Sequence, residues 1–314
     1  MNKRIKLKYI DILFYLVIFI GFMIFYRTNE IQFNVLRSDF IFLVIGLKFL
    51  NFLLFNQLHL NIFHMYKLDI KKNENLTLTY KGYMGNFFGF GKTGTGYKAL
   101  FLKNKFNFSY FKFVSFYIFL QTLTLFFTSS ICFLLLFFTN IAETELKSTL
   151  LVVLAFIMAI SLLSNYILNL ISKLKVLKKI KYLNNLLEST EQNNIFLKNL
   201  TFKNPKFIKV LILQIFIQFN LFLQIYLQAK SLDIHINLLN NFVYNLISQI
   251  SIFLSVTPNA IGIKEFMLIL SNDFIGLSPA DVFNLAVLDR LTDFLSLVVF
   301  SLFYYRFKKF SSRS

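Results

Sequence analysis

The sequence predicts an all-α integral membrane protein, a polytopic bundle of about eight transmembrane helices with a re-entrant or broken helix near residues 76–91. Hydrophobic residues make up 56% of the 314 residues and charged residues only 15%, whereas soluble domains average about 25% charged residues. The apolar residues form long blocks, and segments 113–142, 148–172 and 210–229 contain no charged residue. Runs of about 18 or more apolar residues are typical of transmembrane helices.

Apolar segments alternate with basic loops along the chain. A basic N-terminus leads into a first span at 9–26, which we expect to stay uncleaved because no small-residue cleavage site follows it. No separate soluble domain and no internal repeat is evident, so residues 1–314 are expected to form one membrane domain without a soluble catalytic domain. Further expected spans include 40–60, 113–140, 148–171, 210–229, 234–257 and 282–305.

The net charge of +18 comes from lysines and arginines that cluster between the apolar segments, including nine lysines in 173–209. This distribution follows the positive-inside rule and does not form the basic patch of a nucleic-acid-binding domain. We therefore expect no nucleic-acid partner, and a multi-pass protein of a bacterial inner membrane with both termini in the cytoplasm. The single cysteine and three histidines show no metal-ligand spacing, so no metal and no cofactor is expected.

Six of the ten glycines lie in 82–98, GYMGNFFGFGKTGTGYK. The stretch NFFGFGKT approaches a nucleotide-binding P-loop, but Asn86 stands where the first glycine belongs and no soluble α/β domain surrounds it. Lysines on both sides indicate that 76–91 enters the membrane from the cytoplasmic face and returns. Irregular backbone at that depth must be covered by protein or line a watery cavity. Its freed N–H groups, with Lys92 and Lys98, could hold an anionic headgroup; the alternative is a plain tight turn.

Polar and charged residues interrupt three of the other apolar segments. In 40–60, Lys48, Asn51 and Asn56 are expected to face other helices and not lipid. In 234–257, five polar residues lie three or four apart, so one helix face packs against a partner or lines a cavity; they are Asn237, Asn241, Asn245, Ser248 and Ser251. In TPNAIGIKEF, Pro258 ends a helix, Gly262 permits close packing, and Lys264–Glu265 either reach the interface or lie embedded.

The stretch LDRLTDF places an arginine inside the last expected span. If that helix starts near Val282, Arg290 lies about 12 Å along it, within a hydrocarbon core about 30 Å thick. Asp293 could pair with Arg290 on the same helix face. Alternatively, Arg290 faces a cavity and binds a phosphate, with Glu265 as its counter-ion.

Two of these blocks resemble the lysylphosphatidylglycerol synthase transmembrane region, a family also described as flippase-like or dolichol-phosphate-glucose-synthetase-like. They are GNFFGFGKTGTGYKALFLK, and PNAIGIKE followed about 25 residues later by Arg290. Thr95 stands where the family often has Glu, Asn259–Ala260 replaces its usual glycine pair, and Gln121 lies where an acidic–basic pair is expected. No aminoacyl-transferase domain follows in this sequence, so we do not expect it to lysylate lipids.

The resemblance implies a membrane protein that handles or flips lipids in envelope lipid or surface-glycan assembly. We expect it to bind and translocate an anionic or polyprenyl-linked lipid, as a transporter and not a transferase. The alternatives are a membrane glycosyltransferase that uses a polyprenyl-phosphate sugar, and a scaffold that binds envelope-biosynthesis proteins. The candidate headgroup-binding residues are Asn86, Lys92, Gly94, Gly96, Lys98, Pro258, Gly262, Glu265, Arg290 and Asp293.

Overall fold

The structure, a computed structural model, describes residues 37–89, 92–138, 148, 151–159, 200–254 and 257–311. No strand occurs within these ranges, and the predicted all-α membrane bundle is confirmed. Three of the described helices are long and apolar enough to cross a membrane, namely Ser38–Met65, Lys112–Leu136 and Pro205–Ser231. The expected first span at 9–26 and most of 148–171 and 173–209 lie outside the described residues.

The first half of the described chain is a long helix, a helical hairpin and a second long helix. The hairpin arms pack against each other, and Lys92, just before the second arm, has a left-handed backbone with φ of 56°. The elements are α2 (Ser38–Met65), α3 (Lys72–Phe88), α4 (Thr93–Phe106) and α5 (Tyr110–Phe138).

The second half repeats this order. Its hairpin arms also pack against each other, and a 3₁₀ turn joins them. Its elements are α8 (Pro205–Ser231), α9 (Leu238–Leu254), η3 (Pro258–Ala260), α10 (Ile263–Leu270), α11 (Asn272–Ile275) and α12 (Pro279–Ser311). The tertiary structure therefore contains a repeat, long helix–hairpin–long helix, that was not evident in the sequence.

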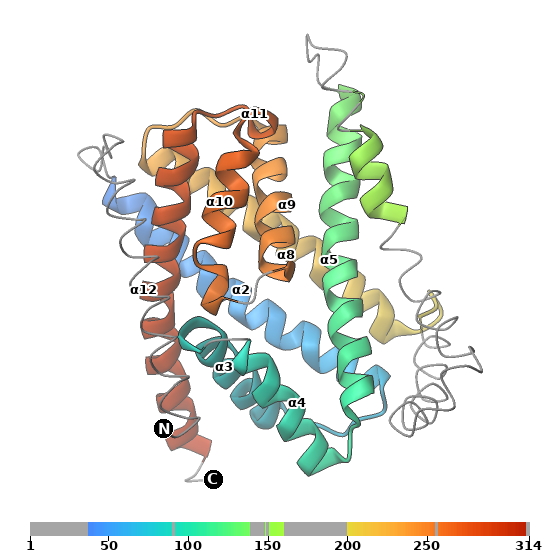
Figure 1. Ribbon diagram of the computed structural model, residues 1–314. Helices are drawn as coiled ribbons and strands as arrows, with labels where there is room; N and C mark the ends of the chain where they lie inside the picture. Colours follow the sequence, from blue (N-terminus) through green and yellow to red (C-terminus); the bar gives the residue numbers. More distant parts are fainter. Residues whose placement is uncertain are drawn as a thin grey trace, which may run out of the picture.

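The two hairpins meet tip to tip (Figure 1). The α3–α4 hairpin enters from the bottom of the view and the α9–α10 hairpin from the top, and η3 contacts α3. At the meeting point, Lys92 Nζ donates a hydrogen bond to the carbonyl oxygen of Phe253 at 2.8 Å. Helices α2 and α8 pack against each other. The irregular backbone of both tips is thus brought to one place in the middle of the bundle.

Two expectations about individual spans are corrected by this arrangement. Segment 234–257 contains a helix, α9, of only 17 residues, and α10 packs beside it after the turn at Pro258, so this part of the chain is a helical hairpin. In the first half, the re-entrant element is longer than 76–91, because the return arm is α4, which begins only at Thr93. The return arms α4 and α10 follow residues with positive φ, Lys92 and Gly262, at which the chain cannot be helical.

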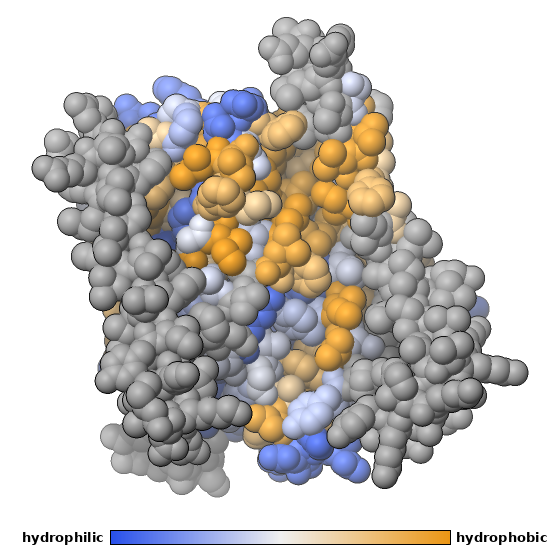
Figure 2. Space-filling model, in the orientation of Figure 1, coloured by the Kyte–Doolittle hydropathy of each residue, from blue (hydrophilic) through white to orange (hydrophobic). Residues whose placement is uncertain are grey.

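On α8, polar residues face the interior of the bundle and apolar residues face outward. This is expected for a helix with one face toward lipid and the other toward a polar interior. Gln214, Gln218, Gln224 and Gln228 are all buried, whereas Phe216 and Phe219 are more than half exposed. Figure 2 shows hydrophobic side chains over α9, α10 and α5, and hydrophilic ones along the upper edge, at the bottom and near the middle of this face.

Close packing of α3 against α4 depends on glycine. A Cβ atom on Gly94 would lie 1.9 Å from the carbonyl oxygen of Gly82 and 2.6 Å from the amide nitrogen of Asn86. A Cβ atom on Gly85 would lie 2.6 Å from the Cα of Gly94. By contrast, a Cβ atom on Gly96 would meet nothing within 4 Å.

Gly94→Ala is therefore expected to lower the melting temperature of the detergent-purified protein, because backbone atoms of α3 must move to admit the methyl group. Gly96→Ala is the matched control, two residues away on the same helix. It is expected to leave the melting temperature unchanged or raise it, since alanine favours a helix over glycine by about 1 kcal/mol. Equal melting temperatures of the two variants would contradict the close packing seen here.

Candidate functional site

A cavity of about 350 Å³ lies where the two hairpin tips meet. Its lining includes residues from α2, α3, α4, α5, α8, α9, η3, α10 and α12. Four polar atoms of its lining are buried without a hydrogen-bond partner in the described residues, namely Asn51 Oδ1, Ser248 Oγ, Thr257 Oγ1 and Arg290 Nη2. A buried polar atom without a partner is costly, so these atoms indicate a volume that accommodates a polar ligand or water.

The cavity brings together residues from both halves of the chain that the sequence singled out. Asn86, Lys92, Lys98, Arg290 and Asp293 all line it. The glycine cluster and PNAIGIKE, more than 160 residues apart, therefore form walls of one cavity.

The other predicted positions do not line the cavity. Gly94 is buried in the α3–α4 contact, and Gly96 is exposed on α4. Pro258 is buried in η3. Gly262 starts α10 with φ of 83°, a conformation that favours glycine, and Glu265 lies one turn later. These residues shape the tips and orient their neighbours.

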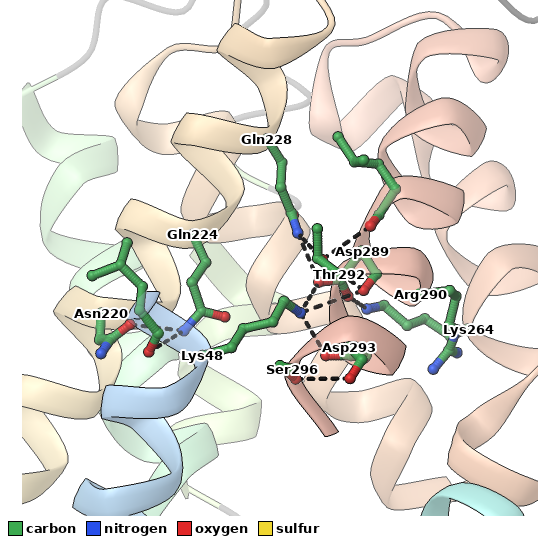
Figure 3. A network of polar contacts seen from close by, with 12 residues as sticks. Lys48, Asn220, Gln224, Gln228, Lys264, Asp289, Arg290, Thr292, Asp293 and Ser296 are labelled. Carbon is green, nitrogen blue, oxygen red and sulfur yellow. Dashed lines mark hydrogen bonds and ion pairs between the residues drawn. The ribbon is translucent and has the colours of Figure 1, made fainter. Parts of the chain in front are cut away.

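A buried ionic network joins α2, α10 and α12 beside the cavity (Figure 3). The carboxylate of Asp289 accepts hydrogen bonds from Lys48 Nζ at 2.6 Å, from Lys264 Nζ, and from Gln228 Nε2 at 3.2 Å. Lys48 Nζ also contacts Asp293 Oδ1 at 2.5 Å. Lys48, Lys264 and Asp289 are all buried in the protein interior.

Arg290 points away from this network and pairs with Glu265. Its Nε donates to Glu265 Oε1 at 2.8 Å, while Glu265 Oε2 accepts the amide N–H of Gly262 at 2.7 Å. Glu265 thus caps α10 and orients Arg290 at once. The expected pair of Arg290 with Asp293 is not formed: Asp289 and Asp293 share a helix face that meets Lys48, whereas Arg290 lies about 100° round the helix from Asp289.

Arg290 Nη2 is buried and has no hydrogen-bond partner in the described part of the protein. A guanidinium group has five N–H donors in a planar fork that suits carboxylate and phosphate oxygens. One edge of Arg290 is satisfied by Glu265, and the group itself lines the cavity. The N–H donors of Nη2 are available to an anion that enters the cavity.

An uncharged polar wall is formed by α5, α8 and α9, where Thr124, Gln224 and Gln249 line the cavity. Thr128 Oγ1 donates to Gln218 Oε1 at 2.8 Å, and Gln214 Nε2 donates to Thr124 Oγ1 at 3.1 Å. The polar face predicted for 234–257 is part of this wall, with the described α9 members Asn241, Asn245, Ser248 and Ser251 all buried. That face both packs and lines the cavity, since Asn241 Nδ2 donates to a carbonyl of α8 while Asn245 and Ser248 border the cavity.

Two non-glycine residues in η3 have glycine-like backbone. Asn259 has φ of 44° and Ala260 has φ of 58°. Asparagine tolerates the left-handed region, whereas alanine adopts it at a cost. The turn therefore has the backbone that the glycine pair expected from the resemblance would adopt without strain.

Asp289 is the functional candidate that sequence reasoning did not single out. The usable signal was the four-residue spacing of Asp289 and Asp293, which puts both carboxylates on one helix face. A lone lysine in an apolar helix, Lys48, also requires a counter-ion within the bundle. Among the described residues, no group of three or more His, Cys, Asp or Glu side chains could hold a metal ion.

Comparison with known proteins agrees with the resemblance of the two blocks. Residues 12–301 match the family model described as the lysylphosphatidylglycerol synthase TM region. No curated protein and no solved structure matches the chain. The family match and the apolar helices support a membrane protein of lipid or envelope biosynthesis.

Proposed function

The chain belongs to the lysylphosphatidylglycerol synthase TM region family, and on that premise we propose that it binds and translocates an anionic lipid or lipid-linked intermediate. The lipid headgroup enters the cavity between the hairpin tips while its acyl or prenyl chains stay in the bilayer. The protein resides in a bacterial inner membrane as a multi-pass protein and serves envelope lipid or surface-glycan assembly.

The observation that carries this proposal is the buried, unpartnered Nη2 of Arg290 on the cavity wall. Five cationic side chains line the cavity but only two carboxylates, those of Asp289 and Asp293. A cavity with this excess attracts an anion, and the guanidinium fork suits a phosphate group.

The meeting of two broken helices supports translocation as well as binding. Non-helical backbone at membrane depth is tolerated only where it is buried in protein or lines a water-filled cavity. Transporters commonly build their sites from discontinuous helices contributed by two repeats, near the middle of the bilayer. The repeated long helix–hairpin–long helix order supplies such a pair of discontinuous elements here.

The proposed orientation places the bottom of Figure 1 in the cytoplasm. The loop after α2, the loop between α4 and α5, and the end of α12 lie at that end. These segments are rich in lysine and arginine, including Lys67, Lys71, Lys103, Lys105 and Arg306. Cytoplasmic loops carry this excess of basic residues, so the C-terminus is cytoplasmic in the proposal, and the N-terminus likewise.

Neither alternative has comparable support. A glycosyltransferase needs an unencumbered carboxylate near its substrate, whereas Asp289, Asp293 and Glu265 are each paired with a cation. A scaffold that binds envelope-biosynthesis proteins through 173–209 would have no need of a polar cavity between broken helices. Membrane lipids are therefore the proposed partners.

Proteoliposomes test the proposal. Purified protein reconstituted with a fluorescent anionic phospholipid is expected to expose the inner-leaflet label to a membrane-impermeant quencher faster than empty liposomes do. A neutral-headgroup lipid carrying the same label is the control for unspecific leakage. A rate no faster than that of empty liposomes, for anionic glycerophospholipids and for polyprenyl phosphates alike, would reject translocation.

A further inference from the structure

The charges around the cavity do not balance. The three carboxylates each have a cationic partner: Asp289 binds Lys48 and Lys264, Asp293 binds Lys48, and Glu265 binds Arg290. Within the described part of the chain, Lys92 and Lys98 also line the cavity but have no carboxylate partner. The cavity therefore has two cations without a carboxylate partner, Lys98 on α4 and Lys92 just before that helix.

The side chain of Lys98 reaches the cavity by crossing α3 at a glycine. A Cβ atom on Gly82 would lie 2.1 Å from Lys98 Cε, so a larger residue at 82 would displace this lysine. The structure shows no hydrogen bond or ion pair of Lys98 Nζ with any described residue, although the lysine lines the cavity. A lysine whose ammonium group has three donors and no partner in such a place is poised to meet an anion.

Lys92 lies at the tip of the hairpin and is only partly satisfied. Its Nζ donates to the carbonyl oxygen of Phe253 at 2.8 Å and lies 5.6 Å from the centre of the Tyr117 ring. These contacts are with neutral groups, so they leave its charge uncompensated. Together with Arg290 Nη2, which is buried and unpartnered, the cavity presents donors from α4, its preceding turn and α12.

We propose that the natural ligand carries two negative charges on its phosphate headgroup, as a phosphomonoester or a diphosphate does, and not the single charge of a phosphodiester. A charge held away from water is costly unless it is paired, and a dianion neutralises both Lys92 and Lys98, which are partly buried. The inference rests on the proposed function, because it assumes that this cavity receives the headgroup. It narrows the substrate to lipid phosphates and diphosphates, in contrast to the phosphodiesters that form most bilayer lipids.

A pair of lipids that differ in one methyl group tests this charge preference. Dioctanoyl phosphatidic acid and dioctanoyl phosphatidylmethanol have the same chains and glycerol, but the methyl ester cannot lose a second proton. Binding to the full-length protein in detergent is measured by thermal shift and calorimetry at pH 8, well above the second pKa of a phosphate monoester, about 6. Phosphatidic acid is expected to bind about tenfold tighter than phosphatidylmethanol, the order of effect for one added charge near a partly buried cation.

Lys98→Gln is expected to remove most of this preference, while Lys81→Gln, which changes an exposed lysine next to Gly82, is expected to keep it. The ratio of the affinities for phosphatidic acid and phosphatidylmethanol is measured on the unmodified protein, so the test does not depend on whether a variant folds. Phosphatidylmethanol binding as tightly as phosphatidic acid would overturn the charge inference and leave the proposed function intact. Binding of neither lipid would overturn both, and inorganic phosphate binding as tightly as phosphatidic acid would show that the site serves a free ion and not a lipid.

Discussion

Asp289→Asn is expected to destabilise the protein by about 3–5 kcal/mol, the usual cost of breaking a buried ion pair. The substitution keeps the shape of the side chain but removes the charge that holds Lys48 and Lys264. Lys48 retains Asp293, whereas Lys264 loses its only carboxylate among the described residues. Because Lys264 lies on α10 and Asp289 on α12, the α9–α10 hairpin loses an anchor to the bundle.

The measurement is the melting temperature in detergent, with an expected fall on the order of 10 °C. The matched control breaks the ion pair of Lys105 with Glu74, in which the lysine side chain is 48% exposed. Surface pairs contribute about 0–1 kcal/mol, so Lys105→Gln is expected to shift the melting temperature by no more than a few degrees. If both variants lost the same stability, Asp289 would not be the hub of a buried network.

Arg290→Ala is expected to reduce the proposed lipid translocation at least tenfold, whereas Arg290→Lys retains part of it. Alanine removes the charge, the unpartnered Nη2 and the ion pair with Glu265. Lysine restores a positive charge but not the planar fork that binds two oxygens at once. If Arg290 had a purely structural role, the translocation rates of the two variants would fall in proportion to the decrease in their melting temperatures.

The same proteoliposome assay measures this, with the melting temperature of each variant recorded beside the rate. Arg306→Ala is the matched control, because Arg306 is exposed on the same helix and does not line the cavity. It is expected to translocate at the unmodified rate. A wild-type rate for Arg290→Ala would assign this arginine to structure alone and remove the main support for the proposed headgroup site.

Much of the architecture was readable from the sequence, because a membrane imposes simple requirements on composition. Helices α2 and α8 contain the spans expected at 40–60 and 210–229, and α5 covers 113–138 of the span expected at 113–140. A long apolar run in lipid must satisfy its backbone hydrogen bonds internally, as a helix does. The polar face of α9 followed from helical periodicity. The glycine-rich break marked the first hairpin correctly, because glycine acts on the local backbone. Pro258 predicted the end of a helix, but the second hairpin was not predicted.

The partners of the charges, by contrast, were decided only by the tertiary structure. Arg290 had one candidate partner three residues away and another 25 residues away, and local geometry permitted both. Packing of α10 against α12 selected Glu265, and packing of α2 against α12 brought Lys48 to Asp289, 241 residues along the chain. The composition determined that these charges must be paired inside the bundle, since lipid cannot solvate them. Which charges pair, and which two lysines remain unpaired at the cavity, depends on how the two repeated halves pack, and no local sequence pattern encodes that.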